Sequence, residues 1–472
     1  MVFSSVIFLI YFLPITLAVY HLIPKSLKNI WILIASIAFY SWGAPTFVFV
    51  LLMSTIIDFY AVQKMDKSAG PIRKRWLIFS ISMNLGLLMY FKYSNFFIEN
   101  VNYGLEAAGI STISWSEVIL PIGISFYTFQ TLTYIIDVYR KDNRPQQRLH
   151  NYLMYIFLFP QIIAGPIITY KKIVHQINNR TEKPSLFLAG FVRFSVGLGK
   201  KVLIANTIGY YAHELLFPDQ GIILTCAAAW LGILAYTLQI YFDFSGYSDM
   251  AIGIGYMFGF KFPENFDRPY TSYSISQFWR KWHITLGEFM KNYLYIPLGG
   301  NRGSALKIYR NLIIVFLLSG FWHGAHWTFI IWGAYHGLWL ILDRLFLEQW
   351  LNKVKWIAIP FTFLVVVNGW ALFFTEDINE ACQQLAAMWS FKGSTIPILP
   401  HQNMYQFYIL LAGLFCFLGL FPALRQLSDK FVSERSTIIG QLFTVSTGVF
   451  LFLESLVYVI SSDFNPFIYF KF

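Results

Sequence analysis

The chain has 472 residues, of which 57% are hydrophobic and only 12% are charged, and its mean hydropathy is +0.54. Soluble globular domains carry about 25% charged residues, so this composition excludes an ordinary soluble protein and predicts an integral membrane protein. The net charge of +11 does not indicate a nucleic-acid partner. The lysines and arginines are spread over short loops between apolar segments, as the positive-inside bias of membrane proteins predicts.

Apolar segments recur along the whole chain and predict on the order of ten or more membrane-embedded segments. We therefore expect an all-α fold, a polytopic helical bundle that forms one domain over residues 1–472. The first segment is expected to be retained, because no small-residue cleavage site follows it. The segments lie near residues 6–23, 29–63, 76–92, 116–136, 152–169, 186–217, 222–242, 308–342, 356–375, 405–423 and 436–461.

Basic residues in the first loops indicate the topology. Lys25 and Lys28 follow the first segment, and a second basic cluster lies between Lys64 and Arg75. An uncharged turn at residues 42–45 separates the two clusters. Since basic loops are retained in the cytoplasm, this alternation predicts an N-terminus on the outer side of the membrane.

The segment near 152–169 does not fit a simple crossing. Residues 95–116 hold acids and few bases, so the next segment is expected to deliver the basic residues 140–148 to the cytoplasm. A further basic cluster at residues 171–183 follows after only one apolar segment, which Pro160 and Pro166 interrupt. Irregular backbone at membrane depth needs protein or a cavity around it. The sequence therefore predicts a re-entrant segment and a cavity here.

A polar stripe is expected on the helix that follows residue 120. Polar residues recur there at intervals of three and four, namely Tyr127, Gln130, Tyr134 and Asp137. Such spacing places them on one face of an otherwise apolar helix. Two interpretations stay open: Tyr127 and Gln130 line a pocket, or the stripe joins packed helices.

The region from residue 239 to 310 is the densest in polar side chains. Gln239, Asp243 and Tyr247 are four residues apart and share one face if their helix is unbroken. Candidate pocket residues in this region are Asp243, Ser245, Tyr247, Asp249, Asn265 and Arg268.

Two carboxylates in this region need cationic partners. Asp243 and Asp249 lie in or beside an apolar segment, where an unpaired charge is costly. Arg268 and Arg280 are the expected partners, because they follow within the same polar stretch.

Aromatic and basic residues alternate in the next motif, Trp279-Arg280-Lys281-Trp282-His283. Such a mixture is typical of an interfacial amphipathic helix at the membrane surface. It would also suit a basic, aromatic entrance for a phosphorylated, adenine-bearing donor. Both interpretations stay open, and Trp279, Arg280 and Trp282 are candidate substrate contacts.

A second histidine motif, Phe321-Trp322-His323-Gly324, lies inside an apolar run. Ionisable side chains at membrane depth are costly and usually mark a working site, although a buried histidine is often a packing residue. We predict acid-base chemistry by His323 and His283, with Trp322 beside them.

The neighbouring histidines are assigned from helix geometry. If the run 312–342 is one unbroken helix, His326 shares the face of His323 and is a candidate pocket residue. His336, thirteen residues after His323, would then point elsewhere and be structural.

These motifs together resemble the membrane-bound O-acyltransferase family, in its bacterial alginate O-acetyltransferase subgroup. The resemblance covers roughly the first 345 residues, whereas the helices expected at 356–461 carry no recognisable motif. The motifs that carry it are Met1 to Ser5, Pro121 to Phe126, Phe159 to Pro166, Asp243 to Asp249, Pro263 to Phe266, Trp279 to His283, Tyr295 to Arg302 and Phe321 to Gly324.

The resemblance implies a helical bundle with re-entrant segments around a central tunnel in a bacterial inner membrane. It implies that acetyl-CoA, a donor substrate and not a bound cofactor, reaches His323 as the catalytic residue, with His283 as the second catalytic position. The acceptor would be an extracytoplasmic glycan, an alginate-like polysaccharide or peptidoglycan, served by a separate periplasmic or membrane-anchored partner. No metal is expected, because no residue cluster has ligand-like spacing.

Two positions depart from the subgroup pattern. Lys291-Asn292 stands where related sequences usually have an Arg-Asp pair, so the same ion pair cannot form. His326 stands where they usually have a small residue. Two alternatives stay open: D-alanyl transfer to teichoic acid within the same family and, from another class, a transporter or flippase.

Overall fold

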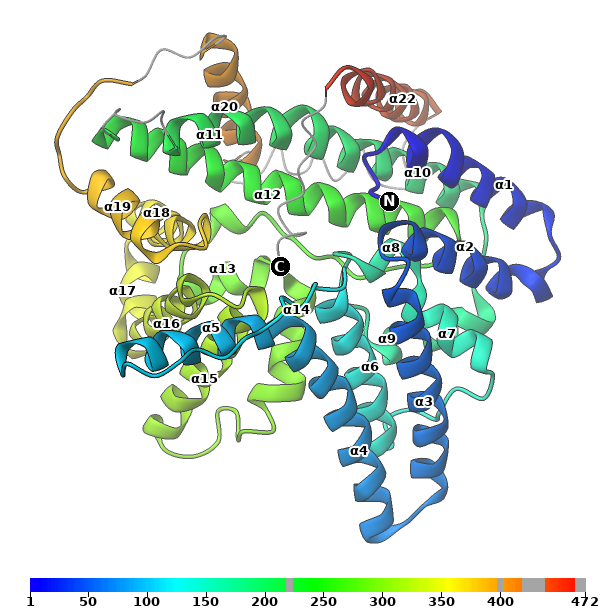
Figure 1. Ribbon diagram of the computed structural model, residues 1–472. Coiled ribbons are helices and arrows are strands. Elements are labelled where there is room, and N and C mark those ends of the chain that lie inside the picture. The colour runs from blue at the N-terminus through cyan, green and yellow to red at the C-terminus, as the bar shows by residue number, and fades with distance from the viewer. Residues whose placement is uncertain (218–223, 397–401, 418–437, 463–472) are drawn as a thin grey trace. The chain divides into compact units, whose positions relative to one another are not determined.

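The computed structural model describes residues 1–217, 224–396, 402–417 and 438–462 (Figure 1). Within these residues every regular element is a helix and no strand occurs, which confirms the all-α prediction. Six described helices are long and apolar enough to cross a membrane, which confirms a multi-pass protein. They are Phe47–Lys67, Cys226–Met257, Ala305–His323, Trp327–Lys353, Lys355–Phe373 and Gly440–Ser461.

This number is lower than ten because several predicted segments are divided. The segment at 6–23 consists of a π-helical turn, η1 (Ile7–Phe12), followed by α1 (Leu13–Leu22). Pro14 lies in the first turn of α1 and has no N–H to donate into the preceding turn. The segment at 186–217 is divided in a similar way, into α10 (Pro184–Gly199), the π turn η4 (Lys200–Ala205) and α11 (Asn206–Leu216).

The segment near 152–169 is broken where the prolines predicted a break. It forms α7 (Leu149–Phe157), the short α8 (Phe159–Ile162) and, after extended backbone, α9 (Tyr170–Asn179). A Cβ at Gly165 would lie 2.6 Å from the carbonyl oxygen of Pro160, so the chain folds back closely on itself there. The break is confirmed, and re-entry from one side of the membrane and the cavity stay predictions.

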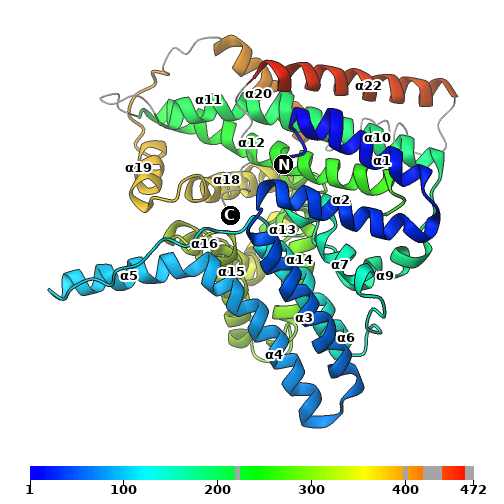
Figure 2. The same ribbon diagram turned by 45° about the vertical axis from the view of Figure 1, so that its right-hand side comes forward.

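Contacts divide the chain into two compact units, and the expectation of one domain stays a prediction. The first unit comprises residues 1–187 and 254–262. Within it α3 and α4 pack side by side and α6 packs against both, whereas α5 points away from the α3–α4 pair (Figure 2). Its further helices are α2 (Lys28–Gly43), α3 (Phe47–Lys67), α4 (Gly70–Leu88), α5 (Ser94–Ala107) and α6 (Ile124–Tyr139).

Helix α6 carries the predicted polar stripe. The four side chains of the stripe, Tyr127, Gln130, Tyr134 and Asp137, are all buried. The Tyr134 hydroxyl accepts a hydrogen bond of 3.1 Å from the backbone N–H of Gln146, as a contact between packed segments would. The side-chain amide of Gln130 has no hydrogen-bond partner among the described residues. The helix is thus confirmed, and the two interpretations of the stripe, pocket lining and contact between packed helices, stay predictions.

The second unit comprises residues 188–253 and 263–472, and α12 (Cys226–Met257) is its longest helix. Helices α10 and α11 run antiparallel to α12. A Cβ at Gly197 would lie 2.6 Å from the Gly246 carbonyl oxygen, and one at Gly232 would meet the Leu216 side chain. Glycines therefore let these backbones approach closely, as small residues do in membrane proteins. Because α12 is unbroken, Gln239, Asp243 and Tyr247 share one face, as predicted.

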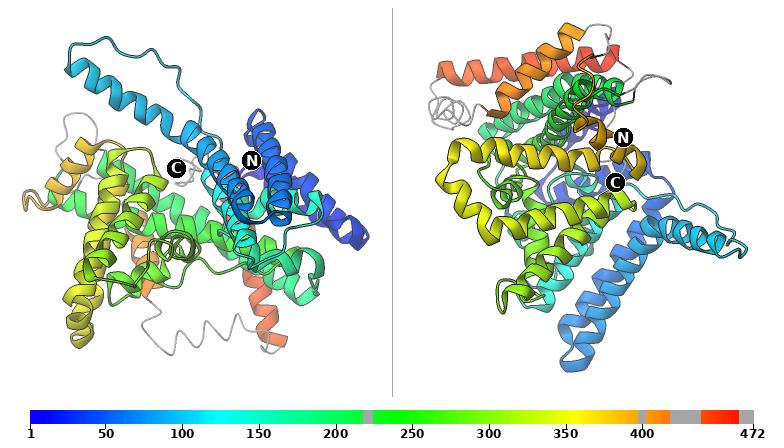
Figure 3. Two further views of the ribbon diagram at one scale, coloured as in Figure 1. Left: turned by 90° about the horizontal axis from the view of Figure 1, so that it is seen from below. Right: turned by 90° about the vertical axis from the view of Figure 1, so that its left-hand side faces the viewer.

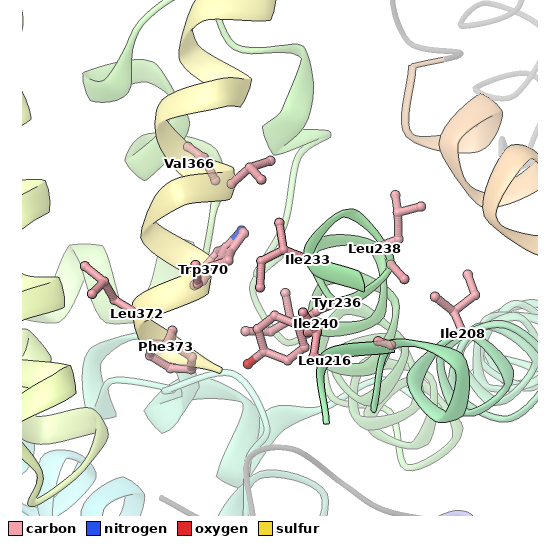
Figure 4. Close-up of a cluster of buried hydrophobic side chains, with 14 of the residues drawn as sticks. Ile208, Leu216, Ile233, Tyr236, Leu238, Ile240, Val366, Trp370, Leu372 and Phe373 are labelled. Atoms are coloured by element: carbon pink, nitrogen blue, oxygen red, sulfur yellow. The ribbon is translucent and has the colours of Figure 1, made fainter. Parts of the chain in front are cut away.

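The remaining helices of the second unit surround this antiparallel group. Helix α22, drawn in red in Figure 3, packs against the η4 turn and the adjoining part of α10, where a Cβ at Gly448 would contact Val192. Side chains from α11, α12 and α18 form the hydrophobic core (Figure 4). These helices are α13 (Ile275–Lys281), α14 (Ile284–Phe289), α15 (Ala305–His323), α16 (Trp327–Leu342), α17 (Glu348–Lys353), α18 (Lys355–Phe373), α19 (Ile378–Met388), α20 (Gln402–Phe417) and α22 (Ile438–Ser461).

Helices α15 and α16 form a hairpin, so the condition of one unbroken helix across 312–342 does not hold. Gly324 has extended backbone, with φ of −163° and ψ of 148°, which ends α15. A Cβ at Gly320 would lie within 3.0 Å of the Phe329 carbonyl oxygen, and one at Gly333 would lie equally close to the Phe316 carbonyl. The two backbones therefore touch, and the chain reverses at Gly324.

We expect Gly320→Ala to destabilise the fold by about 1–3 kcal/mol or more, because the new methyl group meets backbone that cannot move aside. Gly86→Ala is the matched control, since nothing lies within 4 Å of a Cβ there. Thermal unfolding of both variants in detergent is the measurement. Equal melting temperatures for the two variants would contradict the backbone contact.

Candidate active site

His323 lies in the last turn of α15 and has only 3% of its surface exposed. Its ring centroid lies 4.9 Å from that of Trp322, 5.3 Å from Trp332 and 5.2 Å from Phe373. The interplanar angles lie between 73° and 87°, so each ring meets the imidazole nearly edge-on. Aromatic pairs prefer this geometry, and three of them hold the His323 ring in one orientation.

His283 lies between α13 and α14 in the left-handed backbone region, with φ of 44°. Its Nδ1 is 3.1 Å from Oδ1 of Asn265, an oxygen that also accepts from the backbone N–H and the hydroxyl of Thr285. The Asn265 amide donates to the Ser248 hydroxyl, which sets its orientation. A carbonyl oxygen only accepts, so His283 carries its proton on Nδ1 and a lone pair on Nε2. Burial lowers the pKa of His283 to about 3, and the ring is therefore neutral near pH 7.

Trp322 connects the two predicted histidines. Its ring centroid lies 6.2 Å from that of His283 and 4.9 Å from that of His323. The fold thus brings His283 and His323 to a single indole, although they come from separate segments of the chain.

Around α13 the aromatic side chains are buried or half-buried, whereas Arg280 is exposed. Trp282 is 2% exposed and its ring is 4.8 Å from Trp370, while the Trp279 ring is 5.4 Å from Trp332. Arg280 has 65% of its side chain exposed, with its guanidinium 3.9 Å from the Glu348 carboxylate. Trp279 contacts Trp332, a ring that in turn contacts His323. The interfacial and the substrate-contact interpretations of this motif both stay predictions.

The two carboxylates on α12 have cationic partners on α10 and η4. Asp243 lies 2.6 Å from the Lys201 ammonium, and both side chains are almost fully buried. Asp249 lies 2.7 Å from Arg193 and 2.6 Å from Lys200. Of the two arginines that the sequence suggested, Arg280 lies instead 3.9 Å from the Glu348 carboxylate.

The lysine partners come from the π turn η4, which packs against α12. A Cβ at Gly246 would lie 3.0 Å from the backbone nitrogen of Lys201 and 3.1 Å from Lys200. This close approach carries both lysines to the carboxylates. Arg268 and Arg280 belong to segments that follow after the chain has left α12.

The other predicted pocket residues occupy varied positions. Ser245 and Tyr247 are buried on α12, and Arg268 has left-handed backbone with φ of 47°. Tyr127 and Gln130 lie on α6 in the first unit. A place for these residues in a substrate tunnel stays a prediction.

The helix faces assigned to His326 and His336 assumed a helix that continues past Gly324, but α15 ends at His323. The pocket role of His326 and the structural role of His336 stay predictions. His326 precedes α16 with extended backbone, has 43% of its side chain exposed and lies 3.5 Å from the Glu376 carboxylate. His336 is fully buried, and its ring is 5.1 Å from that of Trp332. The hairpin turns His326 outward and returns His336 to the rings around His323.

Sequence reasoning did not identify Trp332 and Phe373 as neighbours of His323. The available signal was Gly324 directly after the histidine, which predicts a helix end. It does not indicate which later residues return to the site. In the described part of the chain no group of three or more His, Cys, Asp or Glu residues is arranged to hold a metal ion.

The six candidate membrane-spanning helices of the described residues define a polytopic membrane protein, in which two buried histidines contact one tryptophan. Residues 42–373 match the family described as MBOAT, membrane-bound O-acyltransferase family, and the chain belongs to this family. It is therefore an integral-membrane O-acyltransferase, an enzyme and not a transporter.

Relatives of this chain confirm the subgroup. A Pseudomonas aeruginosa protein named probable alginate O-acetylase AlgI is 44% identical over 83% of this chain and 75% of its own length. A protein of the same name from Pseudomonas putida is 41% identical over the full length of both chains. A peptidoglycan O-acetyltransferase of Helicobacter pylori is 35% identical over 84% of this chain and 81% of its own.

We expect Lys201→Met to lower the free energy of unfolding by about 3–5 kcal/mol, because it leaves the buried Asp243 carboxylate without its counter-ion. The double variant Lys201→Met/Asp243→Asn removes both charges and should recover most of this loss. Lys171→Met on the exposed face of α9 is the control. Denaturant titration in detergent measures all three, and a double variant no more stable than Lys201→Met would contradict the pairing.

Proposed function

We propose that this enzyme takes an acetyl group from cytoplasmic acetyl-CoA and transfers it for O-acetylation of an extracytoplasmic glycan, with His323 as the general base. The observation that carries the proposal is the buried His323 imidazole, held by three aromatic rings and joined through Trp322 to a second, neutral imidazole. The names of the relatives support acetyl as the group and a polysaccharide or peptidoglycan as the acceptor.

Acyl transfer from a thioester to a hydroxyl needs a base, because a hydroxyl group is a poor nucleophile until its proton is removed. In the proposed step the hydroxyl oxygen bonds to the acetyl carbonyl carbon while His323 takes the hydroxyl proton. The carbon–sulfur bond then breaks, and His323 returns the proton to the departing thiolate. Imidazole serves both steps near pH 7, since its ordinary pKa is about 6.5.

His283 and Trp322 differ in whether they can donate or accept a hydrogen bond during this step. The His283 Nε2 carries a lone pair and can only accept, so His283 does not suit stabilisation of an oxyanion. The Trp322 indole N–H can only donate. We assign stabilisation of the carbonyl oxygen to Trp322, and to His283 a hydrogen bond accepted from the substrate.

The cellular setting follows from the same proposal. The enzyme would lie in the bacterial inner membrane with its N-terminus outside, as the charges of the first loops predict. A separate periplasmic or membrane-anchored partner would complete the transfer to the glycan.

His323→Ala should lower glycan O-acetylation in cells by about 100-fold or more, since removal of a general base typically costs that much. The control is His175→Ala, which changes an exposed histidine on α9. Base-labile acetate released from the purified glycan is the measurement, at protein levels matched by immunoblot. Full acetylation in the His323 variant would overturn the proposal.

Asn265→Ala should reduce kcat by about tenfold or more with a normal amount of folded protein, because His283 then loses the acceptor that holds its proton on Nδ1. The purified enzyme in liposomes, supplied with labelled acetyl-CoA, gives kcat and KM. Asn379→Ala, at an exposed position on α19, is the control. An unchanged kcat for the Asn265 variant would remove His283 from the reaction.

A further inference from the structure

Three rings behind His323 form a closed group in which each contacts the other two. The centroid of His336 lies 4.9 Å from Trp279 and 5.1 Å from Trp332, and the two indoles are 5.4 Å apart. The interplanar angles are 83°, 72° and 84°, so all three contacts are nearly edge-on. Trp332 alone of the three also contacts His323, at 5.3 Å. His336 thus lies one ring behind the candidate catalytic imidazole.

His336 is an unexpected residue to find in this position. It is fully buried, and neither ring nitrogen has a hydrogen-bond partner among the described residues. A buried polar atom without a partner lowers stability, so an apolar side chain would be the more stable choice. Stability therefore does not explain an imidazole here.

The small size and the flat shape of the imidazole ring explain why position 336 is a histidine. Helix α18 passes so close that a Cβ at Gly369 would lie within 3.0 Å of the His336 Nε2. A six-membered aromatic ring would meet this backbone, and an aliphatic side chain would not present a flat edge to Trp332. Imidazole is the aromatic ring small enough to fit.

Helix α18 contacts both His336 and His323. Gly369, which lies against His336, stands one turn before Phe373, and the Phe373 ring lies 5.2 Å from that of His323.

We propose that His336 is a positioning residue for acyl transfer, which holds Trp332 and the Phe373 turn of α18 against the His323 ring. This inference rests on the proposed role of His323. His336 acts by the shape of its ring and not by proton transfer, and it touches no reacting atom.

His336→Leu is the decisive variant, because it fills the space and removes both unpaired nitrogens while losing the flat ring. We expect its melting temperature to equal or exceed that of the wild type, kcat to fall about tenfold or more, and KM for acetyl-CoA to change less than about threefold. His213→Leu, at an exposed position on α11, is the control. A kcat that stays unchanged, or falls only in proportion to folded protein, would overturn the proposal.

The Gly369 contact gives a second, independent test. Gly369→Ala should lower kcat in the wild type, because its methyl group displaces the imidazole. In a His336→Ala background the space is free, so the same change should have little further effect. Additive losses in the double variant would show that the two residues do not act on each other.

A spectroscopic reading separates failure of this inference from failure of the proposed function. Histidine labelled with 13C at Cε1 gives one NMR signal for each of the nine histidines, and His323→Gln identifies that of His323. The ring current of Trp332 should make the His323 signal shift in His336→Leu but not in His213→Leu. This comparison needs no turnover, and an unmoved His323 signal would overturn the positioning role even if acetyl transfer proves correct.

Discussion

The contact between the backbones of α15 and α16 is the constraint on which the rest of the site depends. Two helices approach this closely only where Gly320 and Gly333 face each other without side chains. The close approach requires a tight reversal at Gly324, which leaves His323 as the last helical residue of α15. The returning helix then presents Trp332 to the same imidazole. Glycine, which has no Cβ, thus allows the hairpin that brings Trp332 to His323.

The position of His283 depends on the ion pairs that fix α12. Lys201, Lys200 and Arg193 bind the two carboxylates of α12 from the η4 turn and α10. Ser248 lies between those carboxylates in sequence and accepts the hydrogen bond that orients the Asn265 amide. That amide decides which nitrogen of His283 carries the proton. A structural ion-pair group and the chemistry of an imidazole are therefore connected through one hydroxyl and one amide.

The side chains around the two histidines are largely aromatic, in contrast to the basic loops of the chain. Burial keeps His283 uncharged, and edge-on rings surround His323. In such a low-dielectric setting a few fixed dipoles act strongly on developing charge. For this reason the proposed mechanism assigns stabilisation of the carbonyl oxygen to Trp322, whose indole contacts both His283 and His323.

The sequence by itself determined the membrane class, the helical fold, the break near Pro160, the shared face on α12 and the family, because these follow from composition, local periodicity and ordered motifs. It also singled out His283 and His323. Only the tertiary structure decided that Trp332 and Phe373 reach His323, that Lys201 lies against Asp243, and that His336 lies behind His323. Those outcomes depend on which distant segments touch. Gly324 signals in the sequence that a helix ends, but it does not indicate which later residues return to the histidine.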